Sequence, residues 1–69
     1  PNYNDTQRKI LQFLLYNHKG TISELSDYTG INEKTVRLYL NGFIDDDKIL
    51  VRLSDKVRDK NAKYAFRKD

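Results

Sequence analysis

Residues 21–52, TISELSDYTGINEKTVRLYLNGFIDDDKILVR, decide the fold of this chain. Thr21 is followed three residues later by Glu24, which is the spacing of a capping box at a helix start. Gly30 suits the left-handed conformation that commonly ends a helix. We therefore predict a helix over residues 22–28, followed by a tight turn.

Another helix, the third in chain order, begins after that turn. Asn32 can accept a hydrogen bond from a first-turn amide, so we predict this helix over residues 33–44. Gly42 lies inside the pattern at a cost of about 1 kcal/mol relative to Ala, and we interpret it as an early helix end. The apolar residues recur at the spacing of one buried helix face: Val36, Leu40 and Phe43.

An earlier helix is predicted over residues 5–17. Asn4 or Asp5 can cap its start, and Gly20 can end it. Its apolar residues form one stripe at helical spacing: Ile10, Leu11, Leu14 and Leu15.

Two short segments near the C-terminus alternate in the way that strands do. Residues 49–53 follow an acidic turn at residues 45–47, and residues 62–67 follow the polar loop DKVRDKN. They should pair as a hairpin spanning residues 49–67. Three helices followed by a hairpin predict an α+β fold, a winged helix-turn-helix, formed as a single domain by residues 1–69.

Composition limits what such a chain can do. With 69 residues it can bury one small core and no deep pocket. It has no Cys, which excludes disulfides and thiolate metal sites, and no apolar run long enough to span a bilayer. The net charge of +3 is uneven, because residues 52–68 hold seven Lys or Arg against two Asp. This asymmetry favours a polyanionic partner near the C-terminal segment.

The segment TISELSDYTGINEKTVRLYL resembles the N-terminal domains of DeoR-type transcriptional regulators and related winged-helix proteins. Their pattern runs roughly ILxxL, then TIxELSxxxGVSxxTVRRDLxxL, then a Gly-containing turn and LxR. The resemblance covers residues 10–52. The chain departs from the pattern at residues 45–47, which are Asp, and at Leu38, where the family has a second Arg.

This resemblance implies that the third helix enters the major groove of double-stranded DNA while the wing contacts flanking phosphates, in a regulator of transcription. The candidate base contacts share one exposed helix face by their spacing: Lys34, Arg37, Leu38 and Asn41. Arg37 suits a guanine edge and Asn41 an adenine edge, and Leu38 suits a thymine methyl. The candidate backbone contacts are Asn32, Thr35, Arg52, Lys56, Arg58, Lys60 and Lys63.

A rival interpretation makes the chain a protein-interaction module of a larger replication, transcription or sorting assembly. Leu38 and the apolar wing positions would then form the contact patch, because fold alone does not separate the two functions. Proteins that bind left-handed DNA share this size, with Lys, Asn and Tyr four residues apart and a wing Trp. Here that spacing gives Glu33, Arg37 and Asn41, and the chain has no Trp.

Enzymatic and metal-binding functions are disfavoured by the same residues. The single His18 lacks a Cys or carboxylate partner in the pattern, and three consecutive Asp residues in a turn are more often solvated than metal-bound. We predict no catalytic residue, no metal and no cofactor. We expect a cytoplasmic, nucleoid-associated protein, or a nuclear one in a eukaryote. Since regulators of this type usually dimerise, we also expect either a homodimer or an additional domain.

Overall fold

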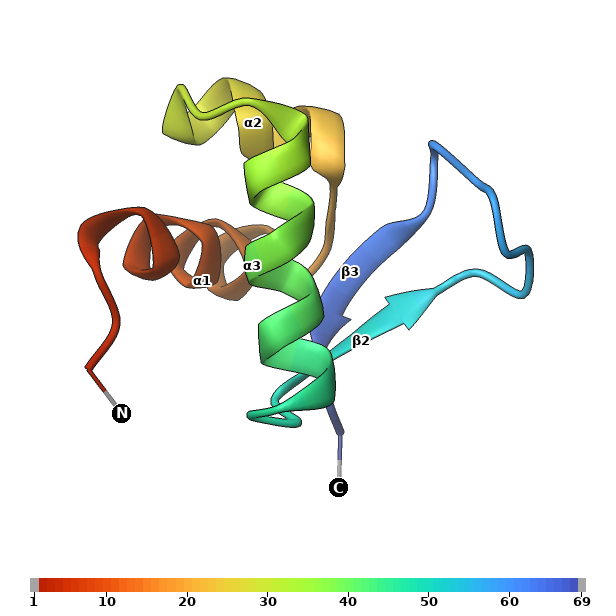
Figure 1. Ribbon diagram of the computed structural model, residues 1–69. Helices are drawn as coiled ribbons and strands as arrows, with labels where there is room; N and C mark the ends of the chain where they lie inside the picture. Colours follow the sequence, from red (N-terminus) through yellow and green to blue (C-terminus); the bar gives the residue numbers. More distant parts are fainter. Residues whose placement is uncertain (1, 69) are drawn as a thin grey trace.

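Three helices pack with a three-stranded antiparallel sheet in the computed structural model, which describes residues 2–68 (Figure 1). The sheet has the order β1–β3–β2, and the β2–β3 hairpin stands beside α3 as a wing. This architecture confirms the predicted α+β winged-helix fold. The elements are α1 (Asp5–Asn17), β1 (Gly20–Thr21), α2 (Ile22–Thr29), α3 (Glu33–Asp45), β2 (Leu50–Leu53) and β3 (Lys63–Phe66).

The helix starts follow from local capping, as predicted. N-caps are present at Asn4, Thr21 and Asn32. At the start of α2, the Glu24 amide donates to Thr21 Oγ1 at 3.1 Å and the Thr21 amide donates to Glu24 Oε1 at 2.8 Å. Gly30 follows α2 with φ of 74°. Each of these interactions joins residues close in the chain, which is why the sequence predicts them well.

One hydrophobic core joins the helices to the hairpin. Its members come from all three helices and from the wing: Ile10, Leu14, Ile22, Leu25, Val36, Leu40, Phe43, Leu50, Ala62 and Tyr64. The predicted buried face of α3, made of Val36, Leu40 and Phe43, is thereby confirmed. The α1 stripe is only partly correct, because the Leu15 side chain is 64% exposed.

Two glycines have roles other than those predicted. α1 ends with His18 as its C-cap, at φ of 70°, so the prediction that Gly20 ends this helix is wrong. Gly20 lies in β1, where an added Cβ would meet Phe13 Cε1 at 2.6 Å; its small size lets β1 approach α1 closely. Gly42 does not end α3 either, since the helix continues to Asp45.

The strands are shorter than the predicted hairpin, and there is one strand more. β1 pairs with β3 through Gly20–Tyr64 and Thr21–Lys63, a contact that no local pattern indicated. Asp45 belongs to α3 rather than to the acidic turn, and Lys48 takes the left-handed conformation, with φ of 56°, at the end of that turn. Within residues 2–68, no helix has both the length and the apolar character needed to cross a bilayer.

Candidate nucleic-acid interface

The exposed face of α3 carries the predicted base-contacting residues. Val36, Leu40 and Phe43 are almost fully buried and hold the helix against the core. The residues between them on the helical wheel are all exposed: Lys34, Arg37, Leu38 and Asn41. The helix therefore presents two groups capable of bidentate hydrogen bonding, the Arg37 guanidinium and the Asn41 amide, one turn apart.

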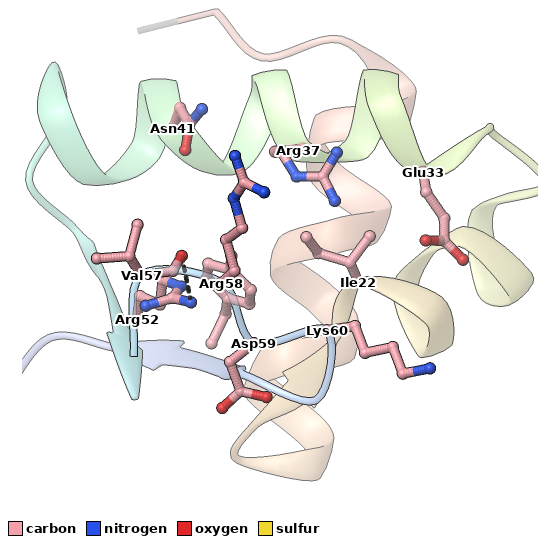
Figure 2. Close-up of a pocket in the computed structure, with 10 residues that line it drawn as sticks. Ile22, Glu33, Arg37, Asn41, Arg52, Val57, Arg58, Asp59 and Lys60 are labelled. Atoms are coloured by element: carbon pink, nitrogen blue, oxygen red, sulfur yellow. Dashed lines mark hydrogen bonds between the residues drawn. The ribbon is translucent and has the colours of Figure 1, made fainter. Parts of the chain in front are cut away.

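An open groove separates this face from the wing (Figure 2). Arg37 and Asn41 line it from α3, and Arg58 extends from the wing loop toward them. The buried side chains of Ile22 and Tyr64 also line it. The groove is thus built jointly from α3 and from the wing, which are distant in the sequence.

The charge of the groove favours an anionic ligand. Two carboxylates, of Glu33 and Asp59, also line it. They are outnumbered by the cations, which are Arg37, Arg52, Arg58 and Lys60. Facing cations with few acids between them raise the local concentration of a polyanion.

Asp59 is engaged within the wing rather than free to repel an anion. Ser54 Oγ donates to Asp59 Oδ2 at 2.8 Å, and the Asn61 amide donates to Asp59 Oδ1 at 3.0 Å. These two hydrogen bonds, with the nearby charges of Lys56 and Arg52, hold the pKa of the Asp59 carboxyl below its ordinary value. The ionised carboxylate consequently organises the wing turn.

Arg52 has a similar internal role. Its guanidinium donates to the Val57 carbonyl at 3.3 Å and, more weakly, to the Ser54 carbonyl at 3.5 Å. Arg52 was predicted to contact DNA phosphates, and the structure places it in the groove, but part of its hydrogen-bonding capacity holds β2 to the wing loop. It acts first as a support for the wing.

The start of α3 offers less to a phosphate than its sequence indicates. Asn32 Oδ1 accepts from the Thr35 amide at 2.8 Å, so that amide is occupied by the cap. Thr35 itself is half-buried. Neither residue lines the groove between α3 and the wing.

The remaining candidates lie outside the groove. Leu38 faces a separate hollow, which Tyr3 and Tyr39 also line. Lys34 and Lys56 are exposed, and they line neither the groove nor that hollow. Lys63 alternates with the buried Tyr64 along β3, so its side chain lies on the opposite face of the sheet. The structure therefore brings together five of the eleven predicted contacts: Arg37, Asn41, Arg52, Arg58 and Lys60.

Besides the buried Ile22 and Tyr64, the groove contains three residues that were not predicted from the sequence: Glu33, Val57 and Asp59. Val57 is 95% exposed in the wing loop. The sequence could have indicated it, because it is the one apolar residue in the polar run DKVRDKN. Glu33 and Asp59 gave no signal, because charged residues at a helix start and in a loop are ordinarily solvated.

The acidic turn after α3 serves as an anchor for the N-terminal segment. The Tyr3 hydroxyl donates to Asp47 Oδ2 at 2.9 Å, and the Tyr3 ring packs edge-on against Phe43 at 5.3 Å. That hydrogen bond, followed by desolvation and by the charge of Asp47, raises the pKa of Tyr3. Across residues 2–68, no three His, Cys, Asp or Glu side chains cluster where they could hold a metal ion.

Comparison of this chain with protein-family models, with curated proteins and with solved structures gives no match.

Proposed function

We propose that this protein binds double-stranded DNA and regulates transcription, with α3 in the major groove and the wing on the phosphate backbone. One observation carries the proposal: the exposed polar face of α3 and the cations of the wing line the same groove. Neither feature alone distinguishes a ligand site from a solvated surface, whereas their convergence favours a long anionic ligand that contacts both.

The dimensions support this ligand. An α-helix with its side chains is about 10–12 Å wide, and the major groove of B-DNA is about 12 Å wide. α3 contains 13 residues and is supported by the core along one side only. With α3 in the major groove, Arg37 contacts a guanine edge and Asn41 an adenine edge. Arg58 and Lys60 then neutralise DNA phosphates beside the major groove.

A protein-interaction function is the second candidate, because the Leu38 side chain is 64% exposed on α3, outside the groove that Arg37 and Asn41 line. In the DNA-binding proposal, Leu38 contacts a thymine methyl. In the rival, it inserts into an apolar pocket of a partner protein, and the interaction is insensitive to salt.

The test is a titration of fluorescent random-sequence duplex DNA at two salt concentrations, followed by selection of preferred sequences. With about three to six phosphate contacts, the logarithm of the affinity should fall with the logarithm of salt concentration at a slope of about −3 to −5. Arg37→Ala should weaken binding to the selected sequence by about 1–3 kcal/mol and affect random DNA less.

Equal weakening of selected and random DNA by Arg37→Ala would remove the base-contacting role of that residue. No binding to any duplex at low salt would overturn the proposal and leave the protein-interaction candidate. In that case Leu38→Glu is the variant that should abolish partner binding.

A further inference from the structure

A second groove lies on the other side of the wing, between the C-terminal end of α1 and the hairpin. We call it the outer groove. Along the strands, Arg52 and Tyr64 face α3, so the alternating residues Val51, Leu53 and Ala65 face away from it. The outer groove and the groove beside α3 are therefore on opposite faces of the hairpin.

The lining of the outer groove is apolar and incompletely covered. Leu15 is 64% exposed and Leu53 is 48% exposed, and both line the outer groove. Val51 and Ala65 are half-buried and extend the apolar surface, and Phe66, which packs against the core at the end of β3, borders it. Contiguous exposed apolar surface in a concave site is typical of a protein-interaction surface.

The rim of the outer groove is basic. Lys19, Arg67 and Lys68 line it together with His18, and all four are exposed. Among the described residues that line it there is no carboxylate. An occupant must therefore be apolar where it meets the leucines and acidic where it meets the rim.

We propose that the outer groove binds an acidic amphipathic helix of another protein. Such a helix places apolar residues on one face at three- and four-residue spacing, and can carry Asp and Glu on both flanks. A second copy of this chain fits less well, because its own Lys19, Arg67 and Lys68 would face the same cations. A membrane fits less well, because the apolar residues line a hollow rather than protruding.

The proposal implies a protein that holds two ligands at once. The acidic helix occupies one face of the hairpin, while the groove beside α3 remains open on the other. The outer groove is also testable without DNA, so failure of the proposed DNA binding leaves this inference intact, and the reverse holds too.

The probe is a fluorescent helical peptide about four turns long, with Leu at positions i, i+3, i+4 and i+7, Glu on the two flanks of the Leu face and Ala at the remaining positions. We expect it to bind the full chain, and to shift the NMR amide signals of Leu15, Leu53 and Ala65 but not those of Arg37. Leu15→Glu should reduce the affinity about tenfold or more. The matched control is Leu38→Glu, since Leu38 is equally exposed but does not line the outer groove.

The inference is overturned by any of four results. These are no binding of the peptide, equal binding of a version with Lys in place of Glu, equal losses from Leu15→Glu and Leu38→Glu, or amide shifts confined to α3. Binding of anionic phosphatidylserine vesicles that Leu15→Glu abolishes, without peptide binding, would assign the surface to a membrane instead.

Discussion

The double substitution Arg58→Ala and Lys60→Ala removes the two freely exposed wing cations that line the groove beside α3. If each neutralises one phosphate, the salt slope should become less steep by about 1.8, because each contact contributes about 0.9. At about 0.15 M salt, this loss of counterion release corresponds to about 30-fold weaker binding, or about 2 kcal/mol. The loss should be the same for every DNA sequence, because phosphate contacts carry no base information.

The assay is fluorescence anisotropy with one duplex over a range of salt concentrations. The matched control is Lys19→Ala with Lys63→Ala, which lowers the net charge of +3 by the same two charges. Lys63 faces away from α3, and Lys19 belongs to the outer groove. The control should therefore keep nearly the original slope.

Equal losses in the two double variants would refute the reasoning. Binding would then depend on overall charge and not on the groove between α3 and the wing. An unchanged slope in the Arg58 and Lys60 variant would also refute it, since the groove cations would then contact no phosphate.

The remaining predictions concern stability. Gly20→Ala should lower the free energy of unfolding by about 1–3 kcal/mol, because the new Cβ would sit 2.6 Å from Phe13 Cε1; Gly42→Ala should raise it by about 1 kcal/mol, since the nearest contact there is 3.9 Å away. Thermal unfolding of both variants checks the pair, and equal effects would contradict the packing argument. Lys48→Gly should raise the free energy of unfolding by about 0.5 kcal/mol. This is the difference between about 1–2 kcal/mol of strain at the left-handed Lys48 and the greater conformational freedom of Gly in the unfolded chain. Chemical denaturation measures the change in stability, and a loss of stability would contradict the prediction. The lowered pKa of Asp59 means that its stabilisation of the wing is complete above the ordinary carboxyl pKa of 3.8 and is lost as pH falls through the lower folded value. An NMR titration of the Asp59 carboxyl carbon should give a midpoint below 3.8, and a midpoint at or above 3.8 would contradict this account.

The sequence predicts the helical half of the fold well because its signals are local. The capping bonds of Thr21 and Asn32 reach only three residues along the chain, and the buried faces repeat within one helix. β1 could not be predicted in this way. It is two residues long and exists only because β3 returns to pair with it. The role of Gly20 could not be predicted for the same reason, since it depends on the Phe13 ring of another element.

The residues of the candidate site were likewise predicted well where local spacing decides their position and poorly where strand pairing does. Helical spacing placed Arg37 and Asn41 correctly on an exposed face, because α3 is regular. The wing residues depended on strand register and on hydrogen bonds that composition does not indicate. Register turns Lys63 to the far face of the sheet, and two carbonyls engage the guanidinium of Arg52.

Thr21 belongs to two elements at once. It pairs with Lys63 at the junction of β1 and β3, and its hydroxyl caps the first turn of α2. A wing that swings away from α1 must break this pairing and disturb the cap in the same step. Opening of the wing and fraying of α2 are then a single cooperative event, so their amides should exchange with solvent at one shared rate. A ligand that holds the wing in place would slow that exchange in a helix that it does not touch.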